Sequence, residues 1–107
     1  MPRAPTSSDP FNAIAEPRRR HILEIIAAEE RSVNEIADAL DMAQPSVSKH
    51  LQVLRTVNLV TVRRDGRKTM YRTNAEALRT IHDWSRMFAQ HWRGQLRRIR
   101  AHAEEER

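Results

Sequence analysis

The sequence predicts a mainly α-helical domain with one small β-hairpin, in the element order α-α-α-α-β-β-α. Apolar residues recur at steps of three and four along most of the chain, which is the helical period. One stretch instead alternates around an Asp-Gly pair, which is typical of a hairpin. The chain has 107 residues, enough for one core. We therefore expect a single domain over residues 10–103, between a flexible, Pro- and Ser-rich tail over 1–9 and an acidic end over 104–107.

Two short helices are predicted at the start of the domain, and proline marks the beginning of both. A helical pattern begins at Pro10, with Phe11, Ile14 and Ala15 on one side, and Pro17 ends it. Because proline is tolerated in the first turn of a helix, Pro17 also begins the second helix, which runs to about residue 28. The inward positions of this second helix are Ile22, Leu23, Ile25 and Ile26.

The next two helices are predicted from a capping signal and a second proline. Ser32 and Glu35 form a capping box, in which each side chain can accept a hydrogen bond from the other residue's backbone N–H. Apolar residues then follow at helical spacing as far as Leu40. A further helix begins at Gln44-Pro45 after a three-residue turn, so the pair forms a helix-turn-helix.

The helix that begins at Gln44 has two contrasting faces. On a helical wheel its inward face consists of Val47, His50, Leu51, Leu54 and Val57. The outward face is polar and carries no acid; it consists of Gln44, Pro45, Ser48, Lys49, Gln52 and Arg55. Amide, hydroxyl and cationic groups can donate to and accept from base edges without repelling phosphate. This face therefore favours a nucleic-acid partner.

A basic hairpin is predicted directly after this helix. Val60 and Val62 alternate with polar residues, and Asp65-Gly66 is a strong turn signal, because glycine adopts the positive φ that tight hairpin turns require. Four cations surround the turn, and they are Arg63, Arg64, Arg67 and Lys68. They repel one another in an isolated domain and become favourable against a polyanion. A helix-turn-helix followed by such a hairpin is the winged helix-turn-helix arrangement.

The last segment, residues 75–103, is predicted to be one long helix that serves in dimerisation. It would extend about 45 Å, more than a domain of this size can cover. An apolar stripe runs along it and supplies the expected dimer interface: Leu78, Ile81, Trp84, Phe88, Trp92 and Leu96. Self-association is favoured because homodimers are the commonest oligomers. The alternative is a helix that belongs to the domain's own core and frays at its end.

The charge is concentrated in one part of the chain. The net charge is +5, but residues 1–42 carry −3, residues 43–72 carry +6 and residues 73–103 carry +4. A dense basic block over the fourth helix and the hairpin is better evidence for a polyanionic partner than a basic chain as a whole.

Composition excludes several classes of protein. The chain has no cysteine, which removes disulfides, thiolate metal sites and cysteine nucleophiles. Its longest apolar run has four residues, against about 20 needed to span a bilayer, and its start lacks a signal-peptide pattern, so we expect a cytoplasmic protein without a membrane partner. No phosphate-binding glycine loop, carboxylate pair or nucleophile–base set is present, so we expect neither an enzyme nor a cofactor.

The sequence resembles the ArsR/SmtB family of winged helix-turn-helix repressors. The segments that carry the resemblance are FNAIAEPRRRHIL at 11–23, SVNEIA at 32–37, QPSVSKHLQVL at 44–54, NLV at 58–60 and RDGR at 64–67. The resemblance implies a homodimer formed through the first and last helices, which adds Phe11 and Ile14 of the first helix to the expected dimer interface. It also implies that the helix from Gln44 enters the major groove of double-stranded DNA.

The resemblance assigns DNA-binding roles to particular residues. Base edges would be contacted by Gln44, Pro45, Ser48 and Lys49, and the DNA backbone by Ser46, Gln52 and Arg55. The hairpin cations Arg63, Arg64, Arg67 and Lys68 would reach the backbone or the minor groove. Ala43 stands where the family often has serine, which removes a helix cap and one hydroxyl that could contact phosphate.

We expect no metal site, although many relatives in the family respond to metal ions. Cysteine sites are absent, and the last helix offers only His82, Asp83, His91 and His102. His82 and His91 point about 180° apart on a helix, and His91 with His102 lacks a carboxylate. His21 and His50 are expected on inward faces. The aromatic last helix is similar to the metal-independent branch of the family.

The leading hypothesis is a sequence-specific, dimeric, double-stranded-DNA-binding repressor that recognises an inverted repeat. One alternative is a repressor gated by a metal or small ligand between the long helices. Another is a protein-interaction module that binds DNA only non-specifically.

Overall fold

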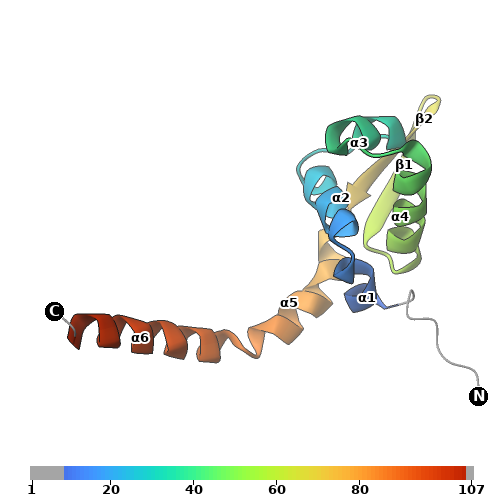
Figure 1. Ribbon diagram of the computed structural model, residues 1–107. Coiled ribbons are helices and arrows are strands. Elements are labelled where there is room, and N and C mark those ends of the chain that lie inside the picture. Colours follow the sequence, from blue (N-terminus) through green and yellow to red (C-terminus); the bar gives the residue numbers. More distant parts are fainter. Residues whose placement is uncertain (1–8, 106–107) are drawn as a thin grey trace, which may run out of the picture.

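The computed structural model describes residues 9–105, and for residues 104 and 105 it describes the backbone only (Figure 1). The expected tail over residues 1–9 therefore lies outside the described residues except for Asp9. The same holds for the expected acidic end over 104–107, apart from the backbone of its first two residues.

The fold class is confirmed: within the described residues four α-helices, a two-stranded hairpin and a final helical segment follow in the expected order, with the final segment divided into α5 and α6. The elements are α1 (Pro10–Ala15), α2 (Pro17–Ala28), α3 (Val33–Leu40), α4 (Gln44–Thr56), β1 (Val60–Asp65), β2 (Lys68–Thr73), the 3₁₀ turn η2 (Ala75–Leu78), α5 (Arg79–Arg86) and α6 (Ala89–Glu105). Helices α1 to α4 and the hairpin form one body, from which α5 and α6 lead away (Figure 1).

The core lies where α2, α3, α4 and the start of β1 meet. The fully or almost fully buried side chains are Ala13, Ile22, Leu23, Ile26, Ile36, Ala37, Val47, Leu51, Leu54, Val57, Leu59 and Val60. The inward positions predicted for α2 are confirmed, with Ile25 half-buried. On α1 the buried residue is Ala13, while Phe11 and Ile14 are half-buried and Ala15 is exposed. His21 was also expected inward and is exposed, since its neighbours Ile22 and Leu23 occupy the buried face of α2.

Side-chain caps fix the starts of the first three helices. The carboxylate of Asp9 accepts from the backbone N–H of Phe11 at 2.8 Å, and the carboxylate of Glu16 caps α2. The predicted capping box at α3 is confirmed: Ser32 Oγ accepts from Glu35 N–H at 3.3 Å, and Glu35 Oε1 accepts from Ser32 N–H at 3.0 Å. These hydrogen bonds, the backbone one first, hold the pKa of the Glu35 carboxyl below its ordinary value.

The hairpin turn lies one residue later than the sequence predicted. Asp65 still pairs with Lys68 across the strands, so the loop consists of Gly66 and Arg67 rather than Asp65 and Gly66. Gly66 has φ +62°, a conformation that glycine adopts without strain and that suits the first central position of a tight hairpin turn.

The loop before α3 fastens the hairpin to the helical body. Arg31 and Tyr71 exchange two backbone hydrogen bonds, at 3.0 and 2.8 Å, so this loop pairs with the free edge of β2 through an isolated antiparallel β-bridge. At the end of β2, Thr73 Oγ1 donates to the carbonyl oxygen of Leu23 at 2.7 Å. The hairpin is therefore tied to α2 and to the start of α3.

The prediction of one continuous helix over 75–103 was wrong. This stretch is divided into η2, α5 and α6, with an irregular turn at Met87 and Phe88. At the turn the N–H groups of Met87 and Phe88 donate to carbonyls three residues back, at 3.2 and 3.0 Å. One turn earlier, the hydroxyl of Ser85 donates to the carbonyl of His82, a local bond that competes with helical pairing and bends helices.

Candidate nucleic-acid interface

The outward face of α4 is as the sequence predicted. Its six predicted residues, Gln44, Pro45, Ser48, Lys49, Gln52 and Arg55, are all exposed, and Ser46 is half-buried. The opposite side of the helix is anchored by the fully buried Val47 and Leu54 and by Leu51. None of the seven predicted contact residues, which are the six outward ones and Ser46, is an acid. The face is a continuous polar and cationic surface that can offer both donors and acceptors.

Both ends of α4 are fixed by tight backbone turns. Before it, Asp41 adopts a left-handed conformation with φ 52°, which ends α3 and directs the chain into Ala43. Ala43 gives α4 no side-chain cap, as the sequence indicated. After it, Asn58 has φ 63°, and the N–H of Leu59 donates to the carbonyl of Leu54 at 2.9 Å. The outward face of α4 is thus held at a fixed angle to the strand that follows.

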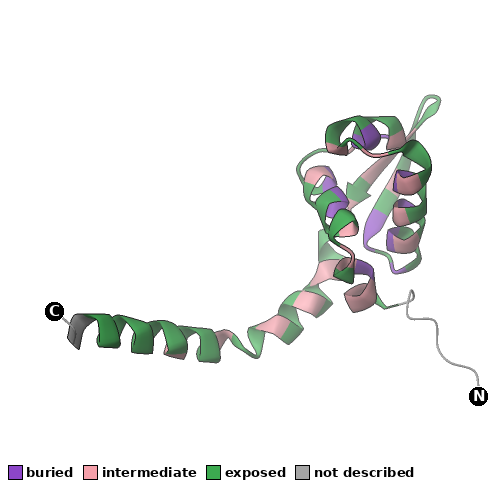
Figure 2. Ribbon diagram, in the orientation of Figure 1, coloured by how far each residue is buried: buried purple, intermediate pink, exposed green. Residues whose placement is uncertain are grey.

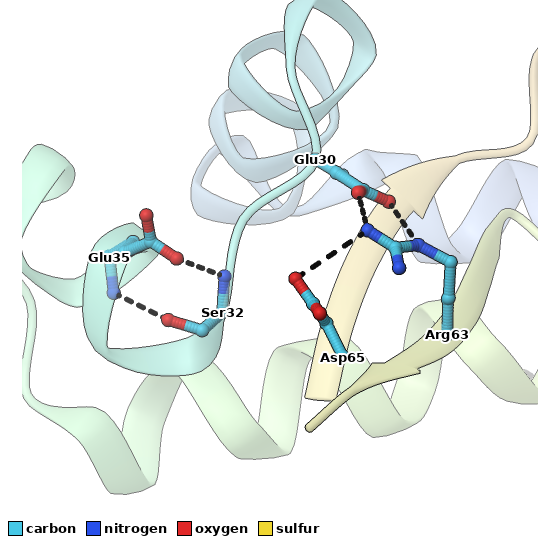
Figure 3. A network of polar contacts seen from close by, with 5 residues as sticks. All are labelled: Glu30, Ser32, Glu35, Arg63 and Asp65. Atoms are coloured by element: carbon cyan, nitrogen blue, oxygen red, sulfur yellow. Dashed lines mark hydrogen bonds and ion pairs between the residues drawn. The ribbon is translucent and has the colours of Figure 1, made fainter. Parts of the chain in front are cut away.

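The four hairpin cations do not act as one group. Arg63 Nε donates to Glu30 Oε2 at 3.2 Å, and its Nη2 contacts the other oxygen of the same carboxylate, with Asp65 at 4.0 Å (Figure 3). The hydrogen bond and the charge of Arg63 lower the pKa of Glu30, and Glu30 raises the pKa of Arg63 in turn. The charge of Arg63 is therefore already compensated by a residue of the same chain.

The other three cations remain at the surface of the hairpin. Arg64 Nη1 donates to Thr69 Oγ1 at the long distance of 3.4 Å. Arg67 and Lys68, at the tip, are exposed and form no ion pair or side-chain hydrogen bond with any described residue. Their charges are available to a partner.

A hollow that the sequence did not reveal lies between α4 and β2. It has a volume of about 270 Å³ and is lined by Ser48, Leu51, Gln52, Arg55 and Tyr71. Sequence reasoning missed Tyr71 as a candidate, because only the pairing of β2 with β1 and Arg31 brings it beside α4. The alternation of Thr69, Tyr71 and Thr73 along β2 was the one available signal, since it puts these three on one face of the hairpin.

His50 lies on the inward side of α4, half-buried, as predicted. Burial lowers its pKa, and the nearby positive charge of Arg19 acts in the same direction. The Nε of Arg19 is itself buried without a hydrogen-bond partner among the described residues. This junction of α2 and α4 therefore disfavours a second positive charge.

The expected dimer residues divide into two groups. Phe11, Ile14, Leu78 and Ile81 are half-buried, and Ile14 and Leu78 pack against the core. Trp84, Phe88, Trp92 and Leu96 are exposed, as are Met87 and Ile99 beside them (Figure 2). One aromatic contact joins the groups: the ring centroids of Phe11 and Trp84 are 5.6 Å apart and edge-on. A second edge-on contact, with centroids 5.2 Å apart, links Trp84 to Phe88 within the exposed group.

The histidines of α5 and α6 do not assemble into a metal site in the structure. Within residues 9–105 no three His, Asp or Glu side chains lie close enough to hold one ion. At this end of the molecule His82 Nδ1 lies 3.5 Å from Asp83 Oδ1. The expectation of no metal remains a prediction.

No helix in the described part of the chain is long and apolar enough to cross a membrane.

Comparisons with known proteins agree on one family. Residues 16–62 match the family model described as bacterial regulatory protein, arsR family. The chain is 41% identical over 71 residues to the HTH-type transcriptional regulator KmtR of Mycobacterium tuberculosis, a match covering 66% of this chain and 55% of KmtR. It is 30% identical over 74 residues to the transcriptional repressor SdpR of Bacillus subtilis, covering 69% of this chain and 82% of SdpR. The match thus spans little more than half the length of KmtR.

A solved structure gives the same answer for the fold. The homodimeric winged helix-turn-helix DNA-binding domain of a possible ArsR-family transcriptional regulator from Mycobacterium bovis superposes with a TM-score of 0.62 at 34% identity. The superposition covers 75% of this chain and 74% of that domain.

Proposed function

Because the chain belongs to the ArsR family of bacterial regulatory proteins, we propose that it is a transcriptional repressor that binds an inverted-repeat operator in double-stranded DNA as a homodimer. The observation that carries the proposal is the acid-free outward face of α4 beside the unpaired cations of the hairpin tip. An ordinary surface helix mixes charges of both signs, whereas a surface that meets phosphate gains from excluding acids.

In the proposed complex α4 enters the major groove. The groove is about 12 Å wide and accepts one α-helix. Base edges are contacted by Gln44, Pro45, Ser48 and Lys49 from the exposed first turns of the helix, and the DNA backbone by Ser46, Gln52 and Arg55. The hairpin contributes Arg64, Arg67 and Lys68, while Arg63 stays paired with Glu30.

The dimer is supported by the exposed apolar stripe of α5 and α6. Leu96 and Ile99 each expose 65% of their surface, and Trp84 and Trp92 expose more than half of theirs. Clustered aromatic and aliphatic side chains of this kind mark an interface. Two copies related by a two-fold axis would present two α4 helices to half-sites about 10 bp apart.

The test is selection of bound duplexes from a random pool. We expect an enriched inverted repeat with the two half-sites about one helical turn apart. Gln44→Ala should then relax the preference at one base pair in each half-site, with a loss of about 1–3 kcal/mol if its contact is bidentate. Absence of any enrichment over bulk DNA would contradict the proposal and favour a protein-interaction module.

A further inference from the structure

The hollow between α4 and β2 has a chemistry suited to one particular ligand. The residues that line it include a hydroxyl side chain (Ser48), an amide (Gln52) and a guanidinium (Arg55), together with Leu51 and Tyr71. We propose that this hollow seats a phosphate of the DNA strand bordering the major groove, and that Tyr71 is a further DNA-binding residue. The inference rests on the proposed function, since it concerns how the same complex is held.

The position of the hollow places it beside a DNA strand. Ser48, Gln52 and Arg55 recur at steps of four and three, so they form one stripe along the flank of α4 that faces the hairpin. A helix with its side chains is about 10–12 Å wide and fills a major groove of about 12 Å. The phosphates that border the groove must then lie against the flanks of the helix, and on this side the flank is the hollow.

Tyr71 is held firmly enough to act as a fixed donor. Its backbone N–H and carbonyl both pair with Arg31, and it lies opposite Val62 in the hairpin register. Its side chain is half-buried against the core. The phenol hydroxyl has no hydrogen-bond partner among residues 9–105, so it is available to a ligand. Phosphate oxygens are common acceptors for tyrosine hydroxyls in protein–DNA complexes.

A second cleft of similar size lacks these properties. It lies between the start of α3 and the hairpin tip, with a volume of about 350 Å³, and its lining includes Glu35 and Asp38 as well as Arg67 and Lys68. Two carboxylates repel a phosphate, whereas the hollow beside α4 has none in its lining. The contrast favours the α4–β2 hollow as the phosphate seat.

The test combines Tyr71→Phe with single methylphosphonate substitutions in the enriched duplex, each of which neutralises one phosphate. Neutralising any contacted phosphate should weaken binding by the wild-type protein; at the sensitive position, the one phosphate per half-site that is seated in the hollow, we expect a loss of roughly tenfold, which is the size of a lost hydrogen bond to a charged group. Tyr71→Phe should weaken binding to unmodified duplex by a similar factor, equally for specific and random sequences. At the sensitive position the variant should show little further loss, because the contact is already gone.

Two further variants test whether the binding loss of Tyr71→Phe comes from the missing hydroxyl rather than from a change in charge or in folding. Tyr71→Phe removes no charge and should leave the salt dependence unchanged, whereas Arg55→Gln should reduce the slope of log K against log salt by about 0.9. Thr61→Val is the matched control, since it removes a hydroxyl from the opposite face of the same hairpin and should leave binding unchanged. Melting temperatures of all variants establish that the fold is intact.

The outcomes are distinguishable. The hollow does not hold a phosphate if Tyr71→Phe binds DNA as tightly as the wild type. The same conclusion follows if the loss of affinity caused by Tyr71→Phe adds fully to the loss caused by every methylphosphonate. In both cases the proposed repressor function stands. If the wild-type protein enriches no duplex at all, the proposed function fails first and the inference fails with it.

Discussion

At the scale of single residues, the hairpin demonstrates that neighbouring cations can have different roles. Arg63 and Arg64 are adjacent, but successive side chains of a strand point to opposite faces. Arg63 therefore reaches Glu30 on the helical body, and Arg64 does not. We therefore expect the hairpin to offer DNA one cation fewer than the count of charges along the sequence suggests.

This division predicts different salt effects for two arginines. Arg67→Ala should reduce the slope of log K against log salt by about 0.9, because one phosphate contact is lost. Arg63→Ala should leave the slope nearly unchanged, because its charge is already compensated within the chain. Titration of a labelled duplex at four salt concentrations measures both. Equal changes in the two variants would contradict the division.

His50 predicts a pH dependence of stability. Burial and the charge of Arg19 lower its folded-state pKa, while Arg18 and Glu16 act on it more weakly and in opposite directions. A group with a lowered folded pKa binds its proton more readily in the unfolded state, whose pKa is about 6.5. The contribution of His50 to the free energy of unfolding is thus fully present above that pH and is lost as the pH falls below it.

Urea denaturation between pH 8 and pH 5 measures this effect. The unfolding midpoint of the wild type should fall as the solution is acidified, and His50→Gln should fall less over the same range. The exposed His21 provides the matched control, since His21→Gln should retain the wild-type dependence. A His50→Gln variant that follows the wild-type curve would show that another group is responsible.

At the scale of elements, the two helices of the helix-turn-helix are capped unequally. Helix α3 begins with the reciprocal Ser32–Glu35 bonds, whereas Ala43 leaves the first amides of α4 without a side-chain acceptor. The backbone of Ala43 is extended, with φ −69° and ψ 140°, which is the conformation that a capping serine adopts.

Serine substitution at this position should therefore stabilise the protein. Ala43→Ser is expected to raise the free energy of unfolding by up to about 1 kcal/mol, and Ser32→Ala to lower it by about 1 kcal/mol or more. Urea titrations of the two variants against the wild type provide the measurement. A destabilised Ala43→Ser variant would mean that the start of α4 cannot accommodate the hydroxyl.

The elements that the sequence predicted well are those that local signals determine. The capping box, the proline at the start of α4 and the glycine of the hairpin turn each act within a few residues, and each is present in the structure. The break after Arg86 was missed because the apolar spacing continues through it and gives no sign of a turn, although a hydroxyl–carbonyl bond at Ser85 lies one turn before it. Tyr71 and the Glu30–Arg63 pair were missed because long-range packing brings them into place.

At the scale of the whole molecule, the C-terminal helices have no core of their own. The radius of gyration is 18.5 Å, whereas a compact chain of about 100 residues has one near 13 Å. The excess comes from α6, which extends away from the body with its apolar stripe exposed (Figure 2). We propose a second copy of the chain as the partner for this surface; the similar domain from Mycobacterium bovis is homodimeric.

A charge on the stripe should therefore dissociate the dimer. Leu96→Glu is expected to raise the dimer dissociation constant at least about tenfold, because a carboxylate would be buried without a partner. Gln90→Glu introduces the same charge on the opposite side of α6 and should leave the dimer intact. Sedimentation velocity over a range of concentrations distinguishes the two. Dissociation by neither variant would contradict a dimer built on this stripe.

The chain has two tryptophans and one tyrosine, and they lie on different surfaces. Trp84 and Trp92 belong to the exposed stripe of α5 and α6, while Tyr71 lines the hollow beside α4. The unmodified protein thus carries its tryptophan reporters on the apolar stripe alone. Its tryptophan emission should therefore follow assembly of the subunits without a contribution from a tryptophan on the face beside α4, and no dye needs to be attached.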